Sequence, residues 1–291
     1  MNKISAAAAS VLFLFSCTKN ENPSVPDIGL TEFSRFYEDP VVERMYSNHV
    51  KDTFKIFKTI PEGYEADTSR TYPVIIILDA NAFFETTVAE LKFNSFIGLI
   101  PKSVVIGIGY KDFPAMDSLR SRDYTFPLAI PEYEMTLSGG AGRFRSFIDG
   151  ELIPKLVNEY RIDMERSAIC GHSLGGYFTL YYALASLQEN KAVIKNIVSA
   201  SPSLHYNQRY LFDMEKRLTS DESLSLNIYV SMGSEDMNDD ESRGILGSFA
   251  SQFSERNRPG LKFKTVEFSN FGHIDAAIPG FIKGLTYIYE E

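Results

Sequence analysis

The chain of 291 residues is 44% hydrophobic, 13% aromatic and 23% charged, a composition that excludes a disordered chain, a collagen-like repeat and a coiled coil. Its 29 Lys and Arg residues against 38 Asp and Glu residues give a net charge of −9. An acidic chain without a basic tract argues against a nucleic-acid partner, because phosphate contacts need clustered cations. With only Cys17 and Cys170 available, a disulfide framework and a Cys-rich zinc site are excluded as well.

The first 17 residues have the layout of a secretory signal. Lys3 is the only charge, and the apolar stretch from Ala6 to Phe15 is too short to span a bilayer, which takes about 20 residues. The stretch Leu14-Phe15-Ser16-Cys17 resembles a bacterial lipobox, in which cleavage precedes the cysteine and the cysteine receives lipid. We therefore expect a lipid anchor at Cys17 that holds the protein to the cell envelope, on the periplasmic or outer-membrane surface. An ordinary signal peptide, with Cys17 incidental, is the alternative.

The polar run TKNENPSVPD that follows Cys17 is typical of a flexible tether. No linker rich in Gly, Pro or Ser interrupts the remainder of the chain, and no transmembrane helix is expected there. The expected organisation is a signal peptide over 1–16, a tether over 17–39 and one domain over 40–291.

Along this domain, short apolar runs alternate with helical patterns. The segment 41–59 alternates between apolar and polar residues and predicts an antiparallel hairpin at a sheet edge. The runs VIIIL (Val74–Leu78) and VVIGIG (Val104–Gly109) are apolar at consecutive positions, which is typical of strands covered by helices on both faces. The expected strands are 54–59, 73–78, 104–109, 167–171, 194–200, 227–232 and 263–268.

The helical patterns lie between these runs. From Gly142 to Tyr160, apolar residues recur at three- and four-residue spacing, and Pro154 predicts a kink or a restart of the helix. A similar pattern runs from Ile278 to Tyr289. Strands that alternate with helices predict the α/β class, with a mostly parallel central sheet and helices on both faces.

The strongest chemical signal is Gly171-His172-Ser173-Leu174-Gly175, which fits the pattern G-x-S-x-G. An apolar run precedes it and a helical pattern follows it, the strand–turn–helix context that a nucleophilic serine needs. Side chains at Gly171 and Gly175 are expected to collide with the neighbouring strand and helix. The turn places the Ser173 hydroxyl at a helix N-terminus, where the backbone N–H of Leu174 can stabilise an oxyanion. A glycine-rich turn without chemistry is the alternative.

A serine hydroxyl needs a base, and the chain has four histidines. His172 lies inside the turn, so its side chain is expected to point away from the serine. His49 precedes the main sheet, and His205 follows a strand and is a candidate for the pocket wall. His273 lies between the last strand and the last helix, where it can meet Ser173 at the carboxyl edge of the sheet. We therefore expect His273 to be the base.

The base needs an acid to orient it. The strand 227–232 ends at Gly233, and Glu235 and Asp236 follow on the loop. Asp236 is the favoured acid and Glu235 the alternative. Either choice gives the chain order Ser, acid, His of the α/β-hydrolases. A second oxyanion donor is expected after the strand 73–78, at the backbone N–H of Ala80 or Asn81, with a plain turn as the alternative.

Together these motifs resemble the putative-esterase branch of the α/β-hydrolases, which includes siderophore trilactone esterases, feruloyl and acetyl-sugar esterases and S-formylglutathione hydrolases. The siderophore-esterase group is the most similar. The resemblance runs from about residue 45 to the C-terminus. It rests on YPVIIILDANAFF (72–84), IGIGY (106–110), RSRDYTFP (120–127), FIDGELIP (147–154), GHSLGGYFTLYYAL (171–184) and SASPSLHY (199–206).

The resemblance implies an α/β-hydrolase fold and a carboxylic-ester hydrolase without a metal or an organic cofactor. It assigns Ser173, His273 and Asp236 to a catalytic triad that works through an acyl-enzyme. The chain departs from the family pattern at Ala80, where Gly is common, and at His205, where Trp is common. These departures change the oxyanion loop and the pocket wall.

The substrate is expected to be a small-molecule or glycan ester, either a siderophore ester or an acylated sugar. Arg122, Tyr110 and His205 are the candidate substrate contacts, and a structural ion pair between Arg122 and Asp123 is the alternative for Arg122. The rival functions are a serine peptidase and a non-catalytic surface-binding lipoprotein on a hydrolase fold. The sequence leaves open the acyl group, the alcohol, the membrane face and the oligomeric state.

Overall fold

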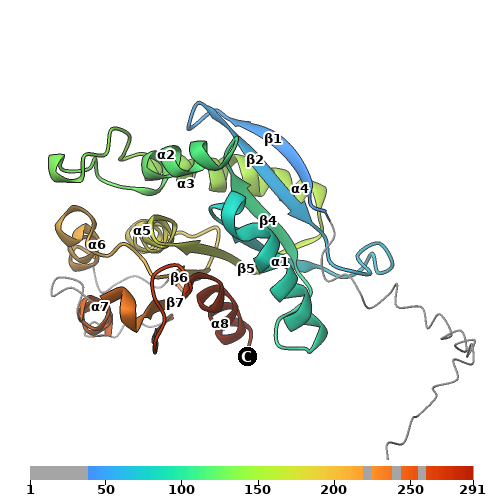
Figure 1. Cartoon of the computed structure of the whole chain (residues 1–291). Coiled ribbons are helices and arrows are strands. Elements are labelled where there is room, and N and C mark those ends of the chain that lie inside the picture. Colours follow the sequence, from blue (N-terminus) through green and yellow to red (C-terminus); the bar gives the residue numbers. More distant parts are fainter. Residues whose placement is uncertain (1–38, 219–223, 238–243, 255–259, 291) are drawn as a thin grey trace, which may run out of the picture. The chain divides into compact units, whose positions relative to one another are not determined.

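The computed structural model describes residues 39–218, 224–237, 244–254 and 260–290 (Figure 1). The predicted signal peptide over 1–16, the candidate lipid site Cys17 and all of the predicted tether except residue 39 lie outside these ranges. Within them, eight strands form one sheet in the order β1-β2-β4-β3-β5-β6-β7-β8. No helix in the described ranges is both long and apolar enough to cross a bilayer.

The strands follow the predicted runs closely. β1 and β2 form the expected antiparallel hairpin, with β1 at the sheet edge, and β2 is also antiparallel to β4. All other neighbours are parallel. The bounds are β1 Val41–Ser47, β2 Asp52–Thr59, β3 Tyr72–Ile77, β4 Val104–Gly109, β5 Ile162–His172, β6 Asn196–Ala200, β7 Leu226–Gly233 and β8 Leu261–Phe268.

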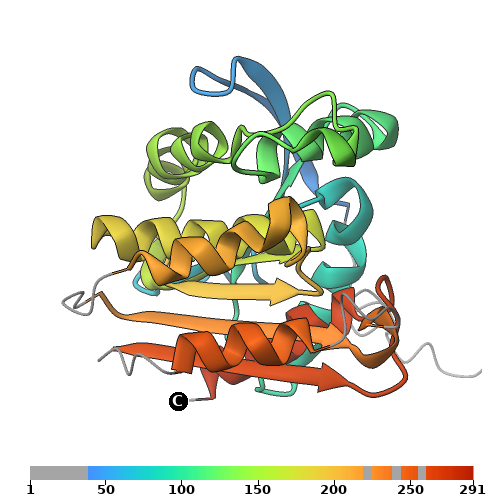
Figure 2. The same cartoon turned by 90° about the vertical axis from the view of Figure 1, so that its left-hand side faces the viewer.

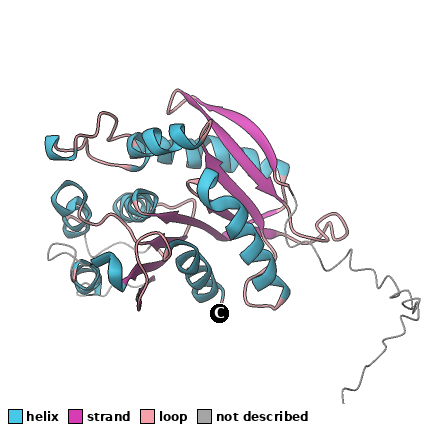
Figure 3. Ribbon diagram, in the orientation of Figure 1, coloured by secondary structure: helices cyan, strands magenta, loops and turns pink. Residues whose placement is uncertain are grey.

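Helices cover both faces of this sheet, so successive residues of the central strands enter two different cores. In β3, Ile75 and Ile77 pack with Phe84 of helix α1 and Phe281 of helix α8, whereas Ile76 enters the core on the opposite face. Helices α5, α6 and α7 lie in front of the strands in Figure 2, and Figure 3 separates the two kinds of element by colour. The helix bounds are α1 Ala80–Phe96, α2 Phe113–Tyr124, α3 Ala141–Phe147, α4 Ile153–Glu159, α5 Leu174–Glu189, α6 Tyr206–Lys216, α7 Ile245–Ser254 and α8 Ala277–Tyr289.

The helical pattern from Gly142 to Tyr160 is divided between α3 and α4, which are joined by a π turn over Ile148–Leu152. Pro154 lies in the first turn of α4. It has no N–H to donate and would clash with a carbonyl of the preceding turn in a continuous α-helix. The predicted interruption at Pro154 is therefore a widened turn and a restart.

Strand β5 is longer than the predicted 167–171. The apolar pattern did not reveal its first residues, because they are partly or fully exposed and do not form an apolar run. The strand runs on through His172, so Ser173 follows at its carboxyl end and helix α5 begins at the next residue. The predicted α/β-hydrolase fold is confirmed by this mostly parallel sheet with helices on both faces.

Candidate active site

The candidate site lies at the carboxyl edge of the parallel strands. Neighbouring parallel strands end at the same edge of a sheet, so the loops that follow them meet there. The loops that bring candidate residues to this edge follow β3 (Asp79, Ala80, Asn81), β5 (Ser173, Leu174), β6 (Ser203, His205), β7 (Glu235, Asp236) and β8 (His273).

Ser173 occupies a strained turn between β5 and α5, with φ 59° and ψ −119°. The surrounding glycines allow this turn to pack. A Cβ on Gly171 would lie 2.2 Å from the Gly175 carbonyl oxygen, and one on Gly176 would lie 2.9 Å from the Ala200 carbonyl oxygen. A Cβ on Gly175 would approach its nearest neighbour, a carboxylate oxygen, only to 3.2 Å. The expected collision therefore applies to Gly171, and Gly176 is more tightly enclosed than Gly175.

The loop after β6 supports the serine. The Ser173 N–H donates to the Ala200 carbonyl at 3.1 Å, and its own carbonyl accepts from the Ser203 N–H at 3.2 Å. The Ser203 hydroxyl lies 3.5 Å from the Ser173 hydroxyl. Sequence reasoning missed Ser203, although it belongs to the SPSL segment that contributed to the family resemblance.

His273 and Asp236 meet directly. His273 Nδ1 lies 2.8 Å from Asp236 Oδ1, with the histidine side chain 40% exposed and the aspartate side chain 15% exposed. Burial alone would raise the pKa of Asp236, but the hydrogen bond and charge interaction with His273 outweigh it and lower that pKa. The Asp236 carboxylate accepts a hydrogen bond from Nδ1–H of His273, so Nε2 is the ring nitrogen that can accept a proton. Glu235, the alternative acid, is exposed.

Two hydrogen bonds hold the loops of the acid and the base against each other. The Glu235 N–H donates to the Phe271 carbonyl at 2.9 Å, and the Asn270 N–H donates to the Ser234 hydroxyl at 2.8 Å. The crossing is so close that a Cβ on Gly233 would lie 2.1 Å from the Phe271 carbonyl oxygen. Residue 233 must therefore be glycine for the two loops to meet in this way.

The expected oxyanion donors begin two helices. Leu174 is the first residue of α5 and Ala80 the first residue of α1, and neither helix has a side chain that caps its N-terminus. First-turn N–H groups have no acceptor within their own helix, so they can stabilise an anion. The side chain of Asn81 has another partner, because it exchanges two hydrogen bonds with the backbone of Tyr110 at 2.7 and 3.1 Å.

An ion pair that the sequence analysis missed links the two helix starts. Arg120 donates to both oxygens of Asp79, at 3.1 and 2.8 Å, and also to the His172 carbonyl at 3.2 Å. Asp79 is buried in a left-handed conformation with φ 52°. Because Arg120 holds both oxygens, the Asp79 side chain does not cap α1. Arg120 thereby joins the loop after β3 to the turn of Ser173.

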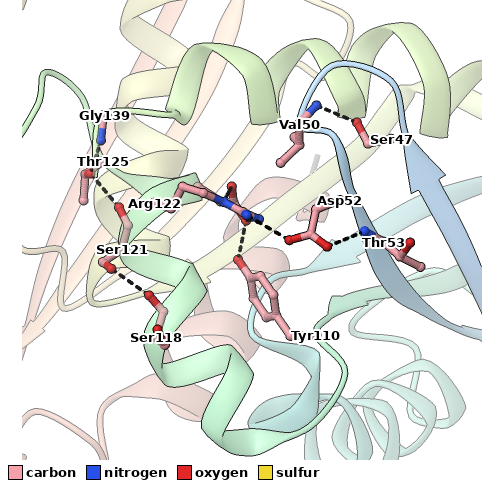
Figure 4. A network of polar contacts seen from close by, with 11 residues as sticks. Ser47, Val50, Asp52, Thr53, Tyr110, Ser118, Ser121, Arg122, Thr125 and Gly139 are labelled. Carbon is pink, nitrogen blue, oxygen red and sulfur yellow. Dashed lines mark hydrogen bonds and ion pairs between the residues drawn. The ribbon is translucent and has the colours of Figure 1, made fainter. Parts of the chain in front are cut away.

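Arg122 and Tyr110, two of the expected substrate contacts, belong to a network of hydrogen bonds around Asp123, and a substrate contact by either stays a prediction. Arg122 donates to both oxygens of Asp123 at 2.8 and 2.9 Å and to Asp52 at 2.8 Å (Figure 4). Tyr110 is buried, and its hydroxyl donates to Asp123 at 3.2 Å. The structural ion pair between Arg122 and Asp123, the alternative interpretation, is what the structure contains. The network fixes α2 to the start of β2.

His205 is exposed, as a pocket-wall residue should be. Its ring stacks on that of Tyr133 with centroids 6.4 Å apart, and its carbonyl accepts from the Tyr133 hydroxyl at 2.9 Å. Two residues before it in the chain is Ser203, which contacts Ser173. A substrate contact by His205 stays a prediction.

His172 is buried and lies against the candidate base. Its Nε2 is 2.7 Å from the His273 carbonyl oxygen, and the two imidazole centroids are 4.6 Å apart. Burial, followed by the charge of His273, lowers the pKa of His172 to about 4. Its side chain is therefore neutral at physiological pH.

Outside this cluster, the described residues offer neither a metal site nor a reactive thiol. Among the described residues, no group of three or more His, Cys, Asp or Glu side chains is arranged to hold a metal ion. Cys170, in β5, is a buried free thiol whose pKa is raised by burial. A raised pKa keeps this thiol protonated and unreactive.

Comparisons with known proteins agree with the geometry. A family model described as "Putative esterase" matches residues 47–258. Ferri-bacillibactin esterase BesA of Bacillus subtilis (strain 168) is 32% identical over 251 residues, which are 80% of this chain and 83% of that protein. Apo-salmochelin esterase of Escherichia coli O6:H1 is 27% identical over 216 residues, 69% of this chain and 64% of that protein. The structure of BES protein from Bacillus cereus has a TM-score of 0.73 at 26% identity, covering 87% of this chain and 95% of that one.

The low pKa of His172 predicts a measurable loss of stability in acid. An unfolded histidine has a pKa near 6.5, so between about pH 6.5 and pH 4 the unfolded chain takes up a proton that the folded chain does not. Stability is therefore lost as the pH falls through this window, by on the order of 3 kcal/mol from this one group. Urea unfolding of the wild type and of His172→Gln, from pH 7 to pH 4.5, should show the difference between them shrinking as the pH falls. Parallel stability curves would contradict the assigned pKa.

Proposed function

Since the chain belongs to the putative esterase family and is a serine ester hydrolase, we propose that Ser173, His273 and Asp236 form its catalytic triad. The observation that carries the proposal is the 2.8 Å hydrogen bond between His273 Nδ1 and Asp236, formed at the sheet edge where the Ser173 turn also ends. This arrangement supplies a serine, a base with a free Nε2 and an ionised acid in the chain order of the α/β-hydrolases.

The reaction proceeds through an acyl-enzyme. His273 Nε2 removes the proton from the Ser173 hydroxyl as its oxygen attacks the ester carbonyl, and the tetrahedral intermediate carries the negative charge on the former carbonyl oxygen. The bond between the acyl carbon and the leaving alcohol oxygen then breaks as His273 gives its proton to that oxygen, and the acyl group remains on Ser173 as an ester. Water activated by His273 hydrolyses this ester and releases the acid. Asp236 stabilises the imidazolium and fixes its orientation.

The oxyanion is stabilised at the two uncapped helix starts. The backbone N–H of Leu174 lies at the start of α5, and that of Ala80 or Asn81 lies at the start of α1. The two turns are adjacent, since a Cβ on Gly175 would be 3.2 Å from Asp79. Fixed donors of this kind stabilise charge that develops only during the reaction.

For the substrate, we favour a siderophore ester over an acylated sugar. The relatives that match this chain over most of its length are named for ferri-bacillibactin and apo-salmochelin, and a third relative, from Emericella nidulans, is named a siderophore enterobactin esterase. All three names describe esterases that act on siderophores, which also supports ester hydrolysis over peptide hydrolysis.

We further propose that the enzyme is a lipoprotein of the cell envelope. The support is the N-terminal sequence, with Lys3, a short apolar stretch and Leu14-Phe15-Ser16-Cys17. Lipid on Cys17 would attach the catalytic domain, residues 40–291, to a membrane through the polar segment between them.

Replacement of Ser173 by Ala should abolish catalysis while the fold survives. The wild type should release the acyl serine units of enterobactin and label with a fluorophosphonate, whereas Ser173→Ala should do neither and should retain the wild-type circular dichroism spectrum. A feruloyl or acetyl sugar ester, tested at the same concentration, should be cut more slowly than enterobactin. Faster cleavage of the sugar ester would reverse the substrate assignment, and undiminished turnover by Ser173→Ala would end the assignment of the nucleophile.

The two neighbouring acids form a matched pair for testing the third member of the triad. Asp236→Asn should lower kcat by on the order of 10⁴-fold, because a neutral amide neither fixes the Nδ1–H tautomer of His273 nor stabilises its imidazolium. Glu235→Gln, which changes the same charge one residue away on an exposed side chain, should leave kcat within about twofold, as surface changes outside the site usually do. The reverse ranking would make Glu235 the acid.

Lipid attachment is tested in cells. Growth with an alkyne fatty acid should label the wild type and Cys170→Ala but not Cys17→Ser, because only the first two retain the cysteine of the lipobox-like stretch. The labelled proteins should sediment with membranes, and Cys17→Ser should not. Equal labelling of Cys17→Ser would rule out this anchor.

A further inference from the structure

We propose that His172, at the first x of the G-x-S-x-G turn, is a positioning residue that holds the base beside the nucleophile by donating its Nε2–H to the His273 carbonyl. The proposal rests on the proposed function, because it assumes that His273 is the base. His172 touches neither substrate nor the reacting atoms in this scheme and acts through His273.

The contact joins two segments that are far apart in the sequence. His172 Nε2 lies 2.7 Å from the His273 carbonyl oxygen, across 101 residues of chain. The imidazole rings are in contact, with centroids 4.6 Å apart and an angle of 49° between their planes. The His172 ring also packs on Phe83 in a T-shaped arrangement with centroids 5.4 Å apart, and Phe83 in turn packs on Phe281 of α8. The imidazole is thus held by packing as well as by its hydrogen bond.

The hydrogen bond fixes the tautomer of His172. A carbonyl oxygen only accepts, so the nitrogen that faces it must carry the proton. The charged and titratable groups that act on His172 are His273, Arg120 of α2 and Asp236 after β7. Burial, followed by the charge interactions with His273 and Arg120, lowers its pKa to about 4, although the hydrogen bond to the His273 carbonyl and the carboxylate of Asp236 act in the opposite direction. At neutral pH the ring is therefore a neutral donor through Nε2.

Two restraints then act on different parts of His273. Asp236 holds the ring through Nδ1, and His172 holds the main chain through the carbonyl oxygen. The second restraint comes from the residue bonded to Ser173 in the chain, so it couples the position of the base to that of the nucleophile directly. A neutral His172 can also remain in contact with His273 when that ring becomes an imidazolium, which a charged neighbour would oppose.

The test compares variants that keep or remove the donor. His172→Gln presents an amide N–H at a reach similar to that of Nε2, whereas His172→Phe and His172→Leu fill the site without a donor. The donor-free variants should lose about 10- to 100-fold in kcat on p-nitrophenyl acetate, with KM within about twofold, because a small displacement of the base has effects of this size. His172→Gln should recover most of the loss. The rate of fluorophosphonate labelling of Ser173 should follow the same order.

Tyr182→Phe is the matched control for general destabilisation. It removes buried hydrogen bonds to Asp149 and to the Ile194 N–H within the hydrophobic core, and none of these residues belongs to the proposed site. This variant should retain wild-type kcat below its unfolding temperature. An equal loss in Tyr182→Phe and His172→Phe would reduce His172 to a packing residue, and equal activity of His172→Gln and His172→Phe would eliminate the role of the donor.

One measurement needs no variant and separates the failure of this inference from the failure of the triad. Nitrogen-15 NMR of the wild type should show His172 as the Nε2–H tautomer, unchanged from pH 8 to pH 5.5. The Nδ1–H tautomer would overturn the positioning role even if Ser173 reacts with the fluorophosphonate. A wild type that does not react at all would instead remove the proposed triad, whatever the tautomer of His172.

Discussion

The hydrogen bond between Asp236 and His273 depends on the close crossing of two loops. The loops follow β7 and β8, which are adjacent and parallel and therefore end at the same edge of the sheet. The crossing brings the Phe271 carbonyl to the position that a Cβ of residue 233 would fill, and the Glu235 N–H donates to that same carbonyl. The relative position of Asp236 and His273 therefore depends on close contact between the two loops. This explains why Gly233 matters for the candidate site although it has no side chain to contribute.

The ion pair between Asp79 and Arg120 keeps the Asp79 carboxylate from capping the first-turn N–H groups of α1. Asp79 is buried directly before α1, where an ionised carboxylate would repel an oxyanion or bind the first-turn N–H groups itself. Arg120 takes both carboxylate oxygens and so compensates the charge. Breaking a buried pair of this kind leaves the remaining charge without compensation, which is strongly unfavourable. Arg122 plays a comparable role toward Asp123 and also pairs with Asp52.

The sequence was sufficient where the signal is local or follows chain order. The apolar runs predicted the strands, and the glycines around Ser173 predicted the turn. Asp236 and His273 follow the last two strands, so chain order predicted that both lie at the carboxyl edge. The sequence did not reveal ion pairs between segments that are distant in the chain. No local pattern connects Arg120 with Asp79, which lies 41 residues earlier and comes close only after β3 and α2 have packed. The role of Arg122 was open for the same reason. The contact of His172 with the base was missed because its pattern position indicated only a side chain that points away from Ser173.

The two imidazoles in contact illustrate how burial assigns different roles to the same chemical group. His172 is 3% exposed, and desolvation keeps it neutral, since charging it would cost the hydration that the ion needs. The His273 side chain is 40% exposed, and its Nδ1 lies 2.8 Å from the carboxylate of Asp236, so this ring is in contact with both a charged group and water. Two adjacent imidazolium ions would repel each other, and the neutral state of His172 avoids that repulsion. The buried ring of His172 is therefore a fixed neutral donor to the His273 carbonyl, whereas the ring of His273 faces Asp236 and solvent.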